Sequence, residues 1–196
     1  MNVVVVLEDT PRDQHIAVPV VRALFQYIGQ PAKVAALPER MRSVEQATDL
    51  EKLLPVLAAR RGMVDLFLLI VDRDCRAPDR PRGGNRAAAL RDLERRVMDS
   101  GELGGNSRFV ACEAIEELEV WLLAGFEQNA WQKIRDDCDP KEAFFEPFAK
   151  ARGVFEKPAE GRAELMADAV RRYRRIRHLC PEIQNLEGRI QNLEQP

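Results

Sequence analysis

The stretch Asp65-Leu66-Phe67-Leu68-Leu69-Ile70-Val71-Asp72-Arg73-Asp74 decides the fold class of this chain. Its six central residues are all apolar, which is typical of a strand that is buried on both faces of a parallel sheet. The apolar run stops abruptly at three successive charged residues. The sequence therefore predicts a strand over residues 65–71, with Asp72 and Asp74 at its carboxyl end.

Strand and helix patterns alternate along the first two thirds of the chain. Further strands are predicted at residues 2–7, 33–37 and 108–112. Amphipathic helices are predicted at residues 16–28, 44–60, 86–98 and 114–126. This alternation predicts a three-layer α/β fold with a mainly parallel central sheet over residues 1–127. Residues 128–196 are predicted to form a helical C-terminal extension, interrupted by Pro140, Pro147, Pro158 and Pro181.

The last helix contains a short repeat. Ile183-Gln184-Asn185-Leu186-Glu187 recurs seven residues later as Ile190-Gln191-Asn192-Leu193-Glu194, which places four apolar residues on heptad positions. Two heptads are fewer than the three or four that are typical of a coiled coil. We therefore favour a helix docked on its own domain over a homodimer through these heptads.

The composition excludes several classes of protein. The 30 basic and 32 acidic side chains nearly cancel, so a uniformly basic nucleic-acid coat is excluded. Hydrophobic residues make up 45% of the chain, which excludes wholesale disorder. Neither a signal peptide nor an apolar run of ~20 residues is present, so we expect a cytoplasmic protein with no membrane partner. Four widely spaced cysteines predict reduced thiols rather than disulfides or a zinc site.

The residue inventory also limits the chemistry. The chain has only two histidines, three serines and two threonines, which disfavours nucleophilic catalysis through a Ser-His or Cys-His pair. It contains neither a GxxxxGK[ST] nor a GxGxxG phosphate motif. Any chemistry is therefore expected to come from carboxylates acting through a divalent metal ion.

Acidic residues follow two of the predicted strands. Glu8 and Asp9 come directly after residues 2–7, with Asp13 a few residues on, and Asp72 and Asp74 follow residues 65–71. Residues two apart at a strand end point to the same side, so Asp72 and Asp74 can share one Mg²⁺ or Mn²⁺ ion, and Glu8 can supply a third oxygen. This arrangement requires the first and third strands to be neighbours. For Asp9 and Asp13, a role as simple turn residues is an equal alternative.

A second acidic segment is Glu113-Ala114-Ile115-Glu116-Glu117-Leu118-Glu119-Val120-Trp121-Leu122-Leu123-Ala124. On a helix, Glu116 and Glu119 would share one face, where like charges call for a metal ion or an arginine partner. A solvated acidic helix face is the alternative. Trp121 is expected in the core.

Together these residues resemble the TOPRIM superfamily of metal-dependent nucleic-acid enzymes. Glu8 matches the first acid of that family, Asp72 and Asp74 match its magnesium-binding DxD motif, and Glu119 matches an additional acid of the nuclease-like branch. The segment that ends in Trp121-Leu122-Leu123-Ala124 looks like that of short, stand-alone bacterial TOPRIM-like proteins. Two positions depart from the pattern: Asp9 replaces the usual Gly, and Gly125 stands where relatives more often carry Asp.

The resemblance implies Mg²⁺-dependent hydrolysis of phosphodiester bonds in DNA or RNA. It also implies an ATPase partner subunit and a place in an anti-phage defence or mobile-element system. Arginines in the segment that begins at the DxD motif are predicted to bind nucleic-acid phosphates: Arg73, Arg76, Arg80, Arg82 and Arg86. A second group, five arginines within residues 171–177, is favoured as an internal salt-bridge network or a partner surface.

Two other functions remain open from the sequence. A receiver-like domain would use Asp72 as a phosphoacceptor, although no Ser or Thr follows the fourth strand. A catalytically inactive TOPRIM-like scaffold that regulates a partner would retain the fold and lose the chemistry. The departures at Asp9 and Gly125 favour this second alternative.

Overall fold

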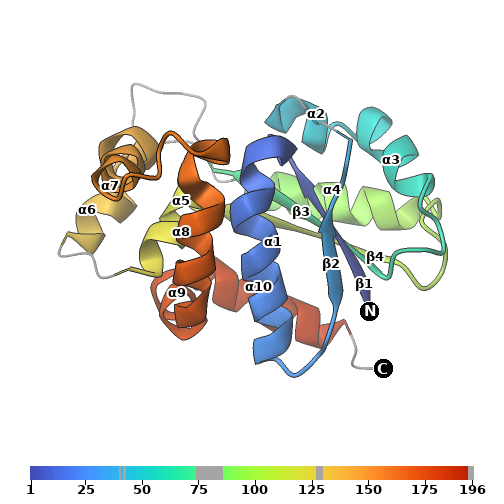
Figure 1. Cartoon of the computed structure of the whole chain (residues 1–196). Coiled ribbons are helices and arrows are strands. Elements are labelled where there is room, and N and C mark those ends of the chain that lie inside the picture. The colour runs from blue at the N-terminus through green and yellow to red at the C-terminus, as the bar shows by residue number, and fades with distance from the viewer. Residues whose placement is uncertain (40, 42, 74–85, 127–129, 194–196) are drawn as a thin grey trace.

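The computed structural model describes residues 1–39, 41, 43–73, 86–126 and 130–193. Four strands form its sheet: β1 (Asn2–Leu7), β2 (Lys33–Ala36), β3 (Leu66–Asp72) and β4 (Arg108–Ala114). Their spatial order is β2-β1-β3-β4, and every described pair is parallel. The predicted three-layer α/β class is thereby confirmed (Figure 1).

Helices cover both faces of the sheet. One face carries α1 (Thr10–Tyr27), α5 (Leu118–Ala124), α8 (Arg162–Ala169), α9 (Tyr173–Leu179) and α10 (Pro181–Asn192). The other carries α2 (Val44–Thr48), α3 (Leu50–Ala58) and α4 (Ala87–Asp99). Alternate residues of β3 enter the two cores: Leu68 and Ile70 on one face, Leu69 and Val71 on the other. This is the burial on both faces that the apolar run predicts.

Shorter helical elements follow α5 in the C-terminal part of the chain. They are α6 (Trp131–Asp136), the π-helix η1 (Lys141–Phe145), α7 (Glu146–Ala151), and the 3₁₀ helices η2 (Pro158–Gly161) and η3 (Val170–Arg172). None of the described helices is long and apolar enough to cross a membrane.

The chain reverses its direction of winding between β1 and β3. It moves from β1 outward to β2 on one side, then crosses to β3 and continues to β4 on the other side. The two central strands pair directly, with Val5 opposite Leu68 and Leu7 opposite Ile70. Open α/β sheets bind ligands beyond the carboxyl ends of their strands at such a reversal. The neighbour relation that the acidic site requires is therefore present.

Two predicted helix boundaries were wrong. Helix α1 begins at Thr10 rather than residue 16, because Pro11 is suited to a first helical turn, where a backbone N–H is not needed. Asp13 consequently lies in that first turn. The predicted helix over residues 44–60 is two helices, because the side chain of Asp49 accepts a hydrogen bond from the Glu51 N–H and starts α3 anew.

The boundary between β4 and α5 also differs from the prediction. Strand β4 extends to Ala114 and helix α5 starts only at Leu118. Glu116 lies between them in a left-handed conformation, with φ of 66°. The prediction that Glu116 and Glu119 share one helix face is therefore wrong.

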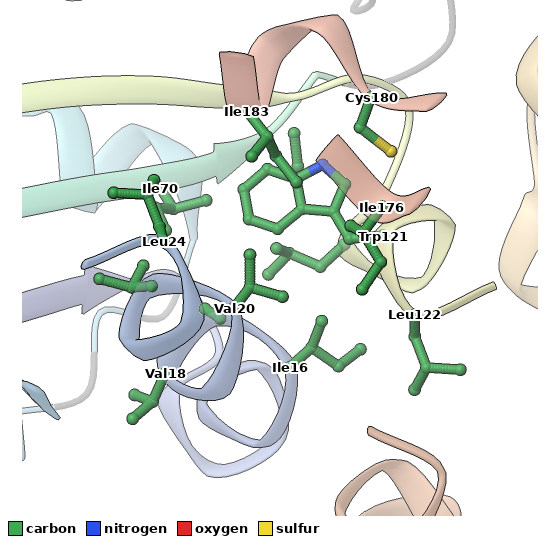
Figure 2. Packing of buried hydrophobic residues seen from close by; sticks show 14 of the residues in the cluster. Ile16, Val18, Val20, Leu24, Ile70, Trp121, Leu122, Ile176, Cys180 and Ile183 are labelled. Carbon is green, nitrogen blue, oxygen red and sulfur yellow. The ribbon is translucent and has the colours of Figure 1, made fainter. Parts of the chain in front are cut away.

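Trp121 lies in the core, as predicted. Figure 2 shows its indole ring between Val20 of α1, Ile176 of α9 and Ile183 of α10. Its Nε1–H is not left unpaired, because it donates to Glu182 Oε1 at 2.9 Å. The C-terminal helices are thus part of the main hydrophobic cluster.

Three of the four heptad residues, Ile183, Leu186 and Ile190, are buried in this same cluster. The favoured interpretation, a helix docked on its own domain, is confirmed for them. A homodimer remains a prediction, as does the domain boundary after residue 127. The prediction of reduced thiols holds for Cys112 and Cys180, which are free and buried. It is wrong for Cys138, which is disulfide-bonded.

The close approach of two helices explains one departure from the TOPRIM pattern. Gly125 ends α5 where α8 crosses it, and a Cβ atom at this position would lie 2.5 Å from the Cβ of Ala169. Real Cβ atoms do not approach one another so closely. Glycine is therefore required here by packing, whatever the function of the neighbouring acids.

Candidate active site

Three of the acids predicted as site residues, Glu8, Asp13 and Asp72, lie together at the carboxyl ends of β1 and β3. Glu8 Oε1 accepts a hydrogen bond from the backbone N–H of Asp72 at 3.0 Å, which joins the two strand ends directly. Asp72 Oδ1 accepts from the backbone N–H of Leu118 at 3.0 Å, and Asp13 Oδ2 accepts from the Asp9 N–H at 3.1 Å. Backbone donors thus hold three carboxylates in fixed orientations at one end of the sheet.

These carboxylates raise one another's pKa values. Burial, and then the negative charges of Glu119, Asp13 and Glu8, hold the pKa of Asp72 well above its usual range. Burial and the charge of Glu119 raise the pKa of Asp13 to about 7, although its hydrogen bond from the Asp9 backbone acts in the opposite direction. Negative charge is therefore concentrated where water is largely excluded, an environment that a cation would stabilise.

Glu117 belongs to this cluster and was missed from the sequence. It lies immediately before α5, and its Oε2 accepts the backbone N–H of Lys141 at 2.8 Å. Burial and the neighbouring charge of Glu119 raise its pKa to about 7. Glu116, a secondary candidate from the sequence, lies one residue before Glu117 in the left-handed conformation. Glu117 was missed because the helix predicted over residues 114–126 begins only at Leu118, which leaves Glu117 before the helix rather than on one of its faces.

Glu119 has an arginine partner, one of the two alternatives that its sequence context leaves open. Arg162 of α8 is 1% exposed, and its Nε donates to Glu119 Oε1 at 3.0 Å. Its Nη2 also contacts Glu119, and its Nη1 pairs with Glu160. Glu119, predicted as a metal ligand, thus shares its oxygen with a guanidinium group. The sequence offered no signal for this partner.

The predicted metal ligands are Glu8, Asp72, Asp74 and Glu119. Asp74 lies outside the described residues, and in the part of the chain that is described no group of three or more His, Cys, Asp or Glu residues is arranged to hold a metal ion. The oxygen donors of Glu8 and Asp72 nevertheless suit Mg²⁺ chemically. Protein Mg²⁺ sites commonly use one or two carboxylates, and water and substrate phosphate supply the remaining oxygens.

Two of the five arginines predicted to bind phosphate can be placed. Arg73 directly follows β3 and is almost completely buried, and Arg86 Nη1 donates to the carbonyl oxygen of Asp72 at 3.3 Å. Arg76, Arg80 and Arg82 lie outside the described residues. Both placed arginines therefore lie at the same end of the sheet as the carboxylates.

The second arginine group is largely an internal network. Arg177 pairs with Glu187, while Arg172 and Arg175 donate to the carbonyl oxygens of Gly125 and Ala124 at 3.3 and 3.2 Å. Positive side chains beside the last carbonyls of a helix are favourably placed, so these contacts fix α9 against the end of α5. The internal salt bridge that this interpretation favours is confirmed for Arg177, whereas Arg172 and Arg175 make internal hydrogen bonds to backbone carbonyls.

Comparisons with protein-family models, with curated proteins and with solved structures find no match to this chain.

The raised pKa values predict how stability depends on pH. Asp13 and Glu117 titrate near 7 in the folded chain, against ordinary values of 3.8 and 4.5. Between about pH 4 and 7 the unfolded chain loses these protons first, so the free energy of unfolding falls as pH rises. We expect a lower melting temperature at pH 8 than at pH 5.5 in metal-free buffer. Asp13→Asn should flatten this dependence.

Mg²⁺ should act most strongly where these groups are ionised. We therefore expect added Mg²⁺ to raise the melting temperature at pH 8 more than at pH 5.5. The exposed residue Asp99 provides the matched control, since Asp99→Asn should leave both dependences unchanged. A metal-free melting temperature that increases from pH 5.5 to 8 would contradict the assigned directions of the pKa shifts.

Proposed function

We propose that this chain is a TOPRIM-like phosphodiesterase that hydrolyses DNA or RNA with Mg²⁺ or Mn²⁺. One observation carries the proposal: the hydrogen bond between Glu8 and the Asp72 backbone, which brings two acids from distant segments together at the winding reversal of the sheet. Isolated turn acids would have no reason to converge there. Burying several carboxylates is costly unless a cation or protons neutralise them.

The surroundings of each residue suit it to a different chemical role. Asp72 and Glu8 would hold the metal ion, with Asp74 as the further ligand that the DxD pattern implies. A divalent cation bound there would neutralise charge on the phosphate and lower the pKa of a bound water. Asp13, with a pKa of about 7, is suited to accept or donate a proton near neutral pH. Arg73 and Arg86 would orient phosphate groups.

Hydrolysis is favoured over transfer to a tyrosine. Tyr27 ends α1, whose other end carries Asp13, so the helix separates them by roughly 20 Å at ~1.5 Å per residue. Tyr173 is buried, and its hydroxyl donates to Glu187 Oε1 at 2.7 Å. Both tyrosines thus belong to packing contacts away from the carboxylates. A water molecule is the more suitable nucleophile.

A catalytically inactive regulatory subunit is the second candidate. The pairing of Arg162 with Glu119 favours it, because a buried guanidinium already supplies part of the positive charge that a metal ion would bring. In this case the fold would serve to bind a partner. The ATPase partner and the role in anti-phage defence are proposals of the same kind, which rest on the TOPRIM resemblance.

The receiver-like alternative receives less support. A phosphoacceptor carboxylate must offer an oxygen to the phosphoryl donor, whereas Asp72 Oδ1 is engaged by the Leu118 backbone N–H. Labelling of Asp72 by acetyl phosphate would favour this alternative over the others.

The deciding experiment is a cleavage assay on the purified chain. Single- and double-stranded DNA and RNA should be incubated with Mg²⁺, with Mn²⁺ and with EDTA, and we expect cleavage only when a metal is present. Glu8→Gln should abolish it, while Glu102→Gln, at an exposed residue, should not. Cleavage that survives Glu8→Gln would refute the site. Metal binding without cleavage of any substrate would instead support the regulatory candidate.

A further inference from the structure

A second feature at this end of the molecule is a cavity of about 690 Å³. It lies between the segment that follows β4, helix α6 and the turn between α9 and α10. The side chains that matter for its chemistry are those of Arg73, Trp131, Gln132, Arg135 and Asp136. The carboxylates of Glu8, Asp13 and Asp72 do not line it. The cavity is therefore distinct from the carboxylate cluster, although Arg73 adjoins Asp72 in the chain.

Arg73 is the residue in this cavity that calls for a ligand. Arg73 is only 8% exposed, and its side-chain Nε has no hydrogen-bond partner among the residues that the structure describes. Its backbone is fixed, because its N–H donates to the Ala114 carbonyl at 3.0 Å. A buried donor without a partner is costly, and more so when it is charged. An anion in the cavity would remove that cost.

The other charges in the cavity are already engaged. Arg135 Nη1 donates to Glu182 Oε1 at 3.1 Å, and Asp136 accepts hydrogen bonds from Gln132 at 2.9 and 3.0 Å. Glu116 also lines the cavity, so the cavity as a whole is not basic. The attraction for an anion is therefore confined to the end formed by Arg73. The same side chain also lines an adjoining cavity of about 480 Å³ beside α4 and α10.

Size and aromatic character restrict the anion further. Cavities of ~300–1,000 Å³ hold small-molecule ligands rather than a nucleic-acid duplex. Trp131 lines the cavity and packs by its inner side against the main hydrophobic cluster, which holds the ring in place. Fixed aromatic rings of this kind stack on nucleobases. A phosphate-binding arginine and a stacking surface in one cavity fit a single nucleotide.

We propose that this cavity binds a single nucleotide, with Arg73 holding its phosphate and Trp131 stacking on its base. The inference rests on the proposed function, since the nucleotide would be the end of a cleaved strand or the released product. Arg73 directly follows Asp72, the last residue of β3, so the cavity adjoins the carboxylate cluster at the end of that strand. The chain would then act preferentially at the ends of single strands.

Binding can be tested on the full chain without any divalent metal. The probes are adenosine 5′-monophosphate, inorganic phosphate and adenosine, measured by calorimetry and by melting temperature. We expect the monophosphate to bind most tightly, and Arg73→Gln to weaken it at least tenfold. Trp131→Leu should weaken the monophosphate but not inorganic phosphate. The control Arg95→Gln, whose side chain is 65% exposed, should bind like the wild type.

The outcomes separate this inference from the proposed function. Strand cleavage with monophosphate binding that is indifferent to Arg73→Gln would overturn the inference and leave the function standing. If the chain binds the monophosphate through Arg73 but cleaves no substrate, the proposed nuclease function is refuted and the nucleotide site is supported. Equal affinity for inorganic phosphate and the monophosphate would overturn the assignment of a nucleotide. Should Arg73→Gln fail to fold by circular dichroism, Arg73→Lys replaces it, because lysine keeps the charge but loses the two-pronged contact.

Discussion

Replacing Arg162 with alanine is expected to lower the free energy of unfolding by about 3–5 kcal/mol. Arg162 and Glu119 are both buried, and Arg162 Nε donates to Glu119 Oε1 at 3.0 Å. Removing the guanidinium leaves Glu119 as an uncompensated charge beside Asp13, Asp72 and Glu117, whose pKa values it already raises. The loss of a positive charge therefore acts on the whole carboxylate cluster.

Arg162 also contributes contacts that are not ionic. Its guanidinium lies over the ring of Phe145 at 4.9 Å, and its Nη1 donates to the Ala159 carbonyl at 3.1 Å. Denaturation in urea, followed by circular dichroism in metal-free buffer, measures the total effect. Arg171→Ala is the control, because that side chain is 78% exposed and its removal should change stability by less than about 0.5 kcal/mol.

Two further measurements distinguish the charge of Arg162 from its packing. The double variant with Glu119→Gln and Arg162→Met removes both charges and should recover part of the lost stability, because no unpaired ion remains. Mg²⁺ should stabilise Arg162→Ala more than the wild type, if the cluster binds metal, because the cation replaces the missing positive charge. A loss below about 1 kcal/mol for Arg162→Ala would contradict the structural role assigned to the pair.

The features that could be predicted from the sequence are those encoded locally. A strand buried on both faces must be apolar throughout, so β3 could be predicted from the composition of residues 65–71 alone. Acids that directly follow a strand lie at its carboxyl end in any parallel sheet, so Glu8 and Asp72 could be placed at the same edge, and the pairing of β1 with β3 then brought them together. Trp121 was assigned to the core because its neighbours recur at helical spacing.

The features that could not be predicted depend on contacts between distant segments. Arg162 lies 43 residues from Glu119, and no local pattern links them. Glu117 joined the cluster because β4 continues to Ala114, since pairing with β3 extends the strand beyond its most apolar residues. The close approach of Gly125 to α8 likewise depends on how two helices pack. Sequence patterns specify which faces are apolar, but not which distant side chain meets a buried charge.

Asp72→Asn is expected to reduce metal-dependent cleavage by about a hundredfold or more. Asparagine removes the negative charge that a metal ion requires, while its amide oxygen can still accept the hydrogen bond from the Leu118 N–H. The pKa of Asp72 is held well above its usual range, so in the absence of metal the folded chain already favours a neutral side chain here. Asp72→Asn should therefore leave the metal-free melting temperature unchanged or raise it.

This separation of activity from stability is what distinguishes a functional carboxylate from a structural one. Asp65 provides the matched control at the opposite end of the same strand, where its Oδ2 accepts the backbone N–H of Asn2 at 2.6 Å. Asp65→Asn should weaken that contact and lower the melting temperature while the cleavage rate stays unchanged. Asp72→Asn should instead lose cleavage without a lower melting temperature. Both variants should be compared by cleavage rate and by melting temperature with and without Mg²⁺. If Asp72→Asn cleaves as fast as the wild type, Asp72 does not hold a catalytic metal, and its carboxylate serves only to start α5.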